Sequence, residues 1–146
     1  MKRLFAGAVL AATHFCAFSY DCFDAAGLYQ HVHPGILRAI SIRENVRCDG
    51  TVRRNSNGSI DVGCMQINSA HFEELAKYGI PPEALQNQCA NIFIGAWHYA
   101  VMVKKYGNTW TAVGAYHSET PEKRDRYAAE VRQIYEKYQP WLDPRP

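Results

Sequence analysis

The longest apolar stretch of the chain, residues 88–106, limits the possible folds more than any other feature. Its apolar side chains recur at helical spacing and form one wide stripe, which contains Ile92, Phe93, Ala96, Trp97, Tyr99 and Val103. A long helix with so wide an apolar stripe has to be covered on most sides by other elements. In a chain of 146 residues, this predicts a single, mainly helical domain built around that helix.

Start and stop signals predict shorter helices around the long one. Asp24 is expected to cap a helix that runs to about residue 31. Pro34 suits the first turn of a second helix that ends near residue 46. Ser69 is expected to start a short helix. Two more helices are predicted at residues 109–117 and 121–138.

A small β lobe is predicted between the second and third helices. Residues 55–58 read NSNG, and β-branched residues flank this turn-rich sequence on both sides. Such a pattern is typical of a hairpin. The expected fold class is therefore mainly α, in the α+β sense, with one small β-hairpin lobe.

The first nineteen residues are interpreted as a secretory signal peptide. A short basic start, MKR, precedes an apolar run, and residues 17–19 offer small side chains for cleavage after Ser19. We therefore expect residues 20–146 to form the mature domain in the periplasm. No later apolar run approaches the length of a membrane span.

Charge and cysteine content narrow the class of protein further. Without Lys2 and Arg3, fourteen basic residues face fourteen acidic ones, which gives no reason to expect nucleic acid or an anionic membrane as a partner. Four cysteines remain, at positions 22, 48, 64 and 89. In an exported chain they predict two disulfides, with three possible connectivities. A metal site has little support because no paired ligand motif is present, and no cofactor is expected.

Glu44 is the first candidate for chemistry. Leu37, Ile40 and Glu44 share one face of the predicted second helix, so a glutamate continues the buried stripe. A Glu in the last turn could also escape to solvent. If it is buried, desolvation raises the pKa of its carboxyl group, and a carboxyl that is protonated near neutral pH can act as a general acid.

Asp61 is the candidate partner of Glu44. It follows Glu44 by seventeen residues, across a hairpin that can fold back over the end of the helix. Two carboxyl groups that face each other across a cleft are the arrangement that cleaves glycosidic bonds, with one as the acid and the other stabilising positive charge on the sugar. A purely structural role for Asp61 in the turn is the alternative.

Three sequence blocks carry a resemblance to a known family. Glu44, the run Gly63-Cys64-Met65-Gln66-Ile67-Asn68 and the pair Ala115-Tyr116 resemble the motifs of Slt-type lytic transglycosylases, bacterial enzymes that cleave peptidoglycan. The resemblance extends from Cys22 to about Tyr138. It is greatest to the small stand-alone enzymes that accompany secretion, conjugation and pilus machines.

The chain departs from the family pattern at three positions. Asn45 follows Glu44 where the family usually has Ser, and His117 stands where many members have Asn. His117 keeps the capacity to hydrogen-bond and adds a titratable group. Asp61 is absent from most Slt-type enzymes, but its surrounding sequence resembles c-type lysozymes. Lysozyme is the standard example of two-carboxylate catalysis.

The resemblance implies roles for the motif residues. Glu44 is expected to be the catalytic acid and then the base, with Asp61 contributing to catalysis or to the turn. The expected substrate-binding residues are Gly63, Met65, Gln66, Asn68, Tyr116 and His117. Gly63 would let a sugar approach the backbone, Gln66 would bind an N-acetyl group, and Tyr116 would orient Glu44. Met65 would form cleft wall or core, and Asn68 would bind sugar or cap the next helix.

The resemblance also implies a disulfide between Cys22 and Cys89. Cys48 and Cys64 would then pair with each other and bracket the lobe that carries Asp61.

The expected function is that of a peptidoglycan lytic transglycosylase. It would cleave the β-1,4 bond between N-acetylmuramic acid (MurNAc) and N-acetylglucosamine (GlcNAc), leave a 1,6-anhydro-MurNAc end, and open the wall for a type III or type IV secretion or type IV pilus machine. One alternative is a muramidase that hydrolyses the bond with Glu44 and Asp61. Another is a non-catalytic, peptidoglycan-binding component of a secretion apparatus.

Overall fold

The computed structural model describes residues 21–142, with side chains to residue 139. The predicted signal peptide lies outside these residues. The chain forms, in order, α1 (Cys22–Gln30), α2 (Pro34–Glu44), β1 (Val52–Arg54), β2 (Ile60–Val62), β3 (Ile67–Asn68), the 3-10 helix η1 (Ser69–His71), α3 (Phe72–Ala76), the 3-10 helix η2 (Pro82–Gln86), α4 (Gln88–Tyr106), α5 (Trp110–His117) and α6 (Pro121–Leu142).

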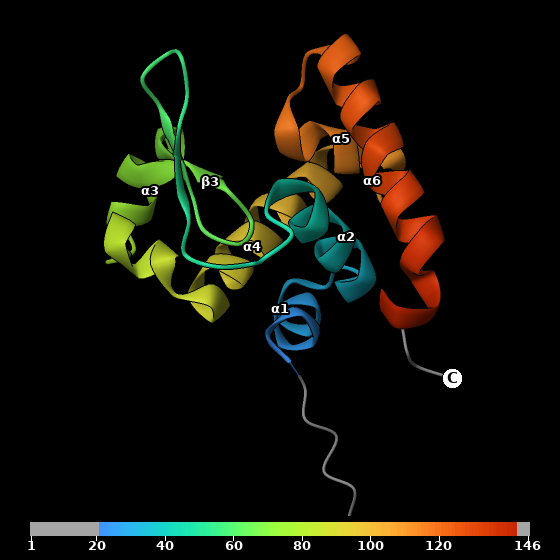
Figure 1. Cartoon of the computed structure of the whole chain (residues 1–146), viewed down its shortest axis with the longest axis horizontal. Helices are drawn as coiled ribbons and strands as arrows, with labels where there is room; N and C mark the ends of the chain where they lie inside the picture. Colours follow the sequence, from blue (N-terminus) through green and yellow to red (C-terminus); the bar gives the residue numbers. More distant parts are fainter. Residues whose placement is uncertain (1–20, 143–146) are drawn as a thin grey trace, which may run out of the picture.

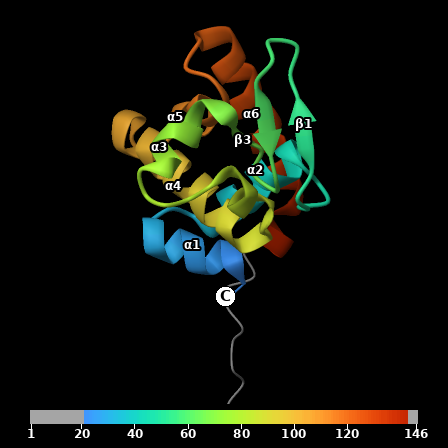
Figure 2. The same cartoon turned by 90° about the vertical axis from the view of Figure 1, so that its left-hand side faces the viewer.

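The elements form two groups on either side of the long helix α4. Figure 1 shows the hairpin and α3 on the left, and α5 and α6 on the right, with α4 running between the two groups. α4 contacts α1 and α5, and α6 packs against both α2 and α5. Figure 2 shows the sheet and α3 facing the viewer, with α6 behind them. The mainly helical fold with one small β lobe is the predicted fold class.

The long helix α4 forms the centre of the core. Ile92, Ala96 and Tyr99 are buried, as their spacing predicts. Asn91 is fully buried as well, which the apolar pattern does not predict. Asn87 caps the helix by accepting a hydrogen bond from the backbone N–H of Ala90. α4 ends at Gly107, which has a φ of 73°.

The first helix begins differently from the prediction. Asp21, not Asp24, is its N-cap, because the Asp21 carboxylate accepts hydrogen bonds from the backbone N–H groups of Phe23 and Asp24. Asp24 lies in the first turn, where it forms an ion pair with Arg38 of α2 at 2.9 Å. The sequence offers two aspartates three residues apart, and only the backbone conformation decides which of them caps the helix.

The sheet is antiparallel, in the order β1-β2-β3. Asp61 at the centre of β2 is paired with Arg53 on β1 and with Asn68 on β3. Paired residues on adjacent strands point to the same face. These three side chains therefore form one row across the sheet.

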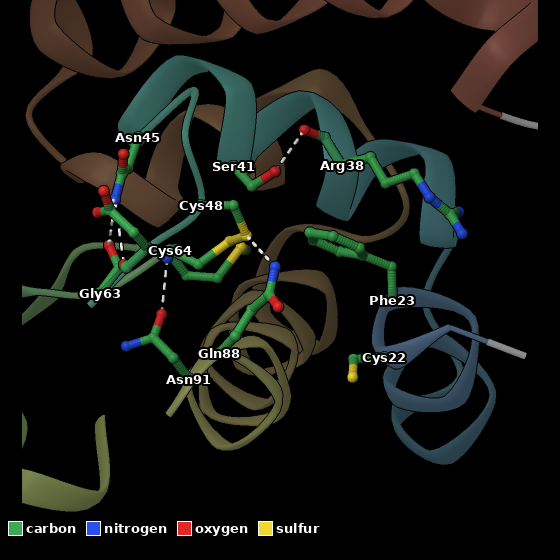
Figure 3. Close-up of a disulfide and its surroundings, with 12 residues drawn as sticks. Cys22, Phe23, Arg38, Ser41, Asn45, Cys48, Gly63, Cys64, Gln88 and Asn91 are labelled. Carbon is green, nitrogen blue, oxygen red and sulfur yellow. Dashed lines mark hydrogen bonds between the residues drawn. A yellow bond between two sulfur atoms is a disulfide. The ribbon is translucent and has the colours of Figure 1, made fainter. Parts of the chain in front are cut away.

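The two disulfides are Cys22–Cys89 and Cys48–Cys64. The first joins α1 to the start of α4. The second closes the segment that carries the hairpin, and Figure 3 shows it beside Gln88 of α4, whose amide donates to the Cys48 Sγ. The first disulfide therefore ties α1 to α4, and the second ties the segment after β2 to the loop after α2.

Replacement of both Cys48 and Cys64 by Ala is expected to lower the free energy of unfolding by about 3 kcal/mol, the entropy of closing a loop of this length. The two residues are separated by 16 positions in the sequence. Urea unfolding under oxidising conditions measures the loss. In reducing buffer the wild type loses the same link, so an unchanged difference between the two proteins would contradict this explanation.

Among residues 21–142, no helix is long and apolar enough to cross a membrane. Within the same range, no group of three or more potential ligand side chains is placed to hold a metal ion.

Candidate active site

A cavity of about 670 Å³ lies between the β lobe and the α5–α6 region. The sheet side contributes mainly amides and hydroxyls, and the helical side contributes mainly titratable groups. Residues that line it include Glu44, Arg53, Asn55, Ser59, Asp61, Gln66, Asn68, His71, His98, Tyr116, His117, Glu119 and Lys123. Both candidate carboxyl groups, Glu44 and Asp61, therefore face the same cavity.

Glu44 lies at the last residue of α2, on the stripe that begins with Leu37 and Ile40. Both apolar residues are fully buried, and Glu44 is half-buried, which confirms the predicted stripe. The helix ends there because Asn45 leaves the helical conformation. Glu44 is therefore fixed by a packed helix while its carboxyl group lines the cavity.

Tyr127 of α6 holds the Glu44 carboxyl group. Its hydroxyl donates a hydrogen bond to the Glu44 Oε1 at 2.6 Å. The Tyr127 ring is almost fully buried, His117 stacks on it with centroids 4.9 Å apart, and the Arg43 guanidinium lies over it at 5.4 Å. Sequence analysis did not identify Tyr127. The sequence pointed to Tyr127 only through its place in KRDRYA, residues 123–128, which lies in the part of the chain that resembles the Slt-type enzymes.

Burial raises the pKa of the Glu44 carboxyl group above its usual value. The hydrogen bond from Tyr127 acts in the opposite direction, as do the nearby charges of Arg43, His117 and Arg53. Desolvation prevails over these opposing effects. The site therefore favours the protonated carboxyl more than water does, and a general acid needs this property.

Tyr116 does not make the bond to Glu44 that the sequence analysis expected. Its hydroxyl instead donates to the backbone oxygen of Met65 at 2.8 Å, which joins α5 to the segment after β2. His98 of α4 bonds the Tyr116 carbonyl oxygen at 3.0 Å. Tyr116 lines the cavity, but its contacts connect the lobe to the helices.

Both carboxylate oxygens of Asp61 accept hydrogen bonds from side-chain amides. Asn68 donates to Oδ1 at 2.6 Å and Asn55 donates to Oδ2 at 2.8 Å. Asn55 and Asn68 also each donate to the Ser59 hydroxyl. This network holds Asp61 in one orientation within the cavity wall. Asn68 also caps η1, because its Oδ1 accepts from the Ala70 N–H.

Gln66 is almost fully buried, yet it lines the cavity. Its Nε2 donates to the backbone oxygen of Gly63 at 2.8 Å, which fixes the orientation of the amide. Its Oε1 is buried and has no hydrogen-bond partner within the described part of the chain. A buried acceptor without a donor is costly, so this oxygen is suited to receive a donor from a bound molecule. Met65 beside it is fully buried core.

Close packing against α4 explains the glycine at position 63. The sequence alone suggests another reason, the approach of a sugar to the backbone. Its φ is 81°, a conformation that favours glycine. A Cβ at this position would collide with the Asn91 side chain and with the backbone oxygen of Leu85. Gly63 is buried and does not line the cavity. The glycine thus allows the lobe to approach the central helix.

Asn45, which replaces the family's usual Ser, is engaged in the loop after α2. Its amide donates to the Asp49 Oδ1 at 3.0 Å and to the Asp49 backbone oxygen at 3.2 Å, and reaches the Gly63 oxygen at 3.4 Å (Figure 3). Hydrogen bonds from Thr51 and Asn45 lower the pKa of Asp49 to about 2. Asn45 therefore fixes the hairpin relative to the end of α2.

The variant Tyr127→Phe is expected to shift the alkaline limb of the pH–activity profile to higher pH. Loss of the hydroxyl removes a hydrogen bond that lowers the pKa of Glu44, so the carboxyl stays protonated to higher pH. The maximal rate should fall about tenfold because the acid is less well oriented. Peptidoglycan cleavage measured between pH 4 and 9 tests both effects.

Tyr135→Phe is the matched control. Its ring contacts His33 and Trp110 rather than the cavity, so the profile should not move. An unshifted limb in Tyr127→Phe would mean that Glu44 does not set it.

Comparison with known proteins adds independent information. Residues 21–138 match the family model described as the transglycosylase SLT domain. The chain is 43% identical over 122 residues to an X polypeptide of Escherichia coli, an alignment that covers 79% of this chain and 72% of the relative. It is 38% identical over 122 residues to the invasion protein IagB of Salmonella typhimurium strain SL1344, covering 80% and 76%. It is 34% identical over 120 residues to protein IpgF of Shigella flexneri, covering 81% and 79%.

Proposed function

Because the chain belongs to the transglycosylase SLT domain family, we propose that it is a lytic transglycosylase that cleaves the MurNAc–GlcNAc β-1,4 bond of peptidoglycan. The mainly helical fold with its three-stranded antiparallel sheet is the lysozyme-like architecture expected for that family. The reaction and the roles of individual residues form the proposal.

One observation supports this function most directly. A carboxyl group of raised pKa, that of Glu44, faces a cavity of about 670 Å³ and receives a 2.6 Å hydrogen bond from Tyr127. Since Tyr127 donates to Oε1, the proton of the acid form resides on Oε2. Cleavage of a glycosidic bond needs such a positioned, protonated carboxyl group.

Glu44 acts first as an acid and then as a base. It donates its proton to the oxygen that leaves C1 of MurNAc, and the C1–O bond breaks. The resulting carboxylate then takes the proton of the C6 hydroxyl of the same sugar, and the C6 oxygen bonds to C1. The products are a free GlcNAc hydroxyl and a 1,6-anhydro-MurNAc end. Glu44 is protonated again and no water is consumed, with the intramolecular nucleophile favoured by proximity.

Asp61 stabilises the positive charge that develops on the sugar. Its two amide donors, Asn55 and Asn68, keep the carboxyl group facing the cavity. The same placement favours one second candidate function, a muramidase in which water captures the cationic intermediate. Gln66 contributes its free Oε1 as an acceptor for the N–H of an N-acetyl group.

We place the enzyme in the periplasm, where it opens the wall for a secretion or pilus machine. The predicted signal peptide and the two disulfides support export. The likeness to a relative named as an invasion protein supports the link to such machinery.

Mass spectrometry of muropeptides released by residues 20–146 separates the candidate reactions. We expect 1,6-anhydro ends from the wild type. Free reducing ends, heavier by one water, would instead identify a muramidase. The variant Asp61→Asn should release the same product at a rate at least about tenfold lower than that of the wild type. An unchanged rate in that variant would assign Asp61 a structural role, and binding of the wild type without any cleavage would favour the non-catalytic alternative.

A further inference from the structure

The cations that line the cavity differ in how their charge is used. Arg43 forms an ion pair with Glu130 at 2.5 Å. Arg53 donates to the backbone oxygen of Glu44 at 3.0 Å. Lys123 of α6 lines the same cavity and is exposed. Within residues 21–139, no carboxylate lies within ion-pair distance of Lys123.

Among the acids that line the cavity, Glu119 is nearest to Lys123 in the sequence, and its charge is already neutralised. Glu119 bonds Lys105 and the Tyr106 hydroxyl, both on α4. On α6 itself, Arg126 and Tyr127 occupy the positions three and four residues beyond Lys123, so the helix surface offers it no acid there. The positive charge of Lys123 is therefore uncompensated at this wall.

Lys123 does not stabilise its own helix either. It is the third residue of α6, and a cation in the first turn opposes the positive end of the helix macrodipole. A lysine that faces the cavity, has no acid partner and opposes the macrodipole has no evident role in the fold. These features are those expected for a group that meets an anionic ligand.

The substrate of the proposed reaction carries its negative charge in one place. In peptide-substituted strands the sugars are uncharged, because the lactyl carboxyl group of MurNAc is bound in an amide, whereas the attached peptide bears free carboxylates. We propose that Lys123 binds a carboxylate of this peptide, so that the enzyme prefers peptide-substituted strands to denuded ones. This inference rests on the proposed function and names the substrate form that the same site selects.

The test compares kcat/KM on three preparations of the same glycan strands. One keeps its peptides, one is denuded by an amidase and has the lactyl carboxylates freed by that cleavage converted to neutral amides, and one keeps peptides whose carboxylates are converted to neutral amides. Lys123→Gln should lower the ratio of substituted to denuded kcat/KM by about 1.5- to fivefold, the range for an exposed ion pair. Lys123→Arg should restore the ratio. Lys104→Gln, an exposed residue outside the cavity lining, should leave both rates unchanged.

Charge dependence separates ion pairing from a structural effect. The wild-type preference should fall to that of Lys123→Gln on the neutralised strands, and also when salt is raised from about 50 mM to about 500 mM. An identical ratio in wild type and Lys123→Gln would overturn the proposal. A wild-type preference that survives neutralisation of the carboxylates would do the same.

A binding measurement keeps this test independent of catalysis. The variant Glu44→Gln, with and without Lys123→Gln, is titrated with substituted and denuded strands. The proposal is supported if the double variant binds substituted strands more weakly than Glu44→Gln does, while both variants bind denuded strands equally. Equal binding of substituted strands by the two variants overturns it. If the wild type cleaves no preparation, the proposed function fails while the binding result still decides the role of Lys123.

Discussion

Replacement of Glu44 by Gln is expected to reduce peptidoglycan cleavage by about a thousandfold, while substrate binding persists. Gln keeps the shape of the side chain and can still accept the hydrogen bond from Tyr127, but it has no proton to donate. General acid–base catalysis contributes about 10² to 10⁴ in rate, and here one group performs both steps. Release of soluble muropeptides measured under single-turnover conditions gives the factor.

The same variant should be more stable than the wild type at neutral pH. Burial raises the folded-state pKa of Glu44 above its usual value of 4.5. The folded state binds this proton more tightly than the unfolded state, so the contribution of Glu44 to the free energy of unfolding is fully present below the unfolded-state pKa. It is lost as pH rises through the folded-state pKa. The Tm of Glu44→Gln relative to wild type should thus increase from pH 4 to pH 8.

Glu122→Gln is the control for both measurements. Glu122 is exposed in the first turn of α6 and does not line the cavity, so Glu122→Gln should keep the wild-type rate. Its Tm relative to wild type should fall slightly from pH 4 to pH 8, opposite to Glu44→Gln, because the charged Glu122 stabilises the N-terminus of the helix. If Glu44→Gln retained more than about a tenth of the wild-type rate, Glu44 would not be the acid. If its relative Tm did not change with pH, the carboxyl group would not be buried as a costly anion.

Replacement of Asn91 by Leu is expected to destabilise the fold by about 4 to 6 kcal/mol. The fully buried Asn91 amide accepts from the Met65 N–H at 2.7 Å and donates to the backbone oxygens of Val62 and Leu85, both at 2.8 Å. Leu is of similar size but leaves all three buried groups unpaired. Each such group costs about 1–3 kcal/mol. Urea unfolding monitored by circular dichroism gives the loss.

Activity provides a second measurement for Asn91→Leu. The amide connects α4 to residues on either side of Cys64, Val62 and Met65, so its loss should loosen the wall that carries Asp61. Figure 3 shows Asn91 beside Cys64. We expect KM to rise in the fraction that remains folded. Asn108→Leu is the control, because Asn108 is exposed and should change stability by less than about 0.5 kcal/mol. A loss below about 1 kcal/mol in Asn91→Leu would mean that water replaces the amide.

The sequence predicted the helices, the hairpin and the stripe that buries Glu44, because these depend on residues near one another in the chain. Helical spacing placed Leu37, Ile40 and Glu44 on one face, and the structure confirms it. Local signals failed where two candidates competed. Asp21 and Asp24 are equally good caps by type, and the backbone conformation selected Asp21.

The tertiary structure alone decided which groups meet in the cavity. The bond from Tyr127 to Glu44 spans 83 positions, and that from Asn91 to Met65 spans 26. Helical periodicity gives each residue a face but does not give the distance between two helices, so it did not distinguish Tyr127 from Tyr116. It also did not show that Lys105 neutralises Glu119, whereas no carboxylate among residues 21–139 pairs with Lys123. The sequence therefore determined which carboxyl is buried, and the packing of α6 against α2 determined what holds it, because such contacts depend on where whole elements lie.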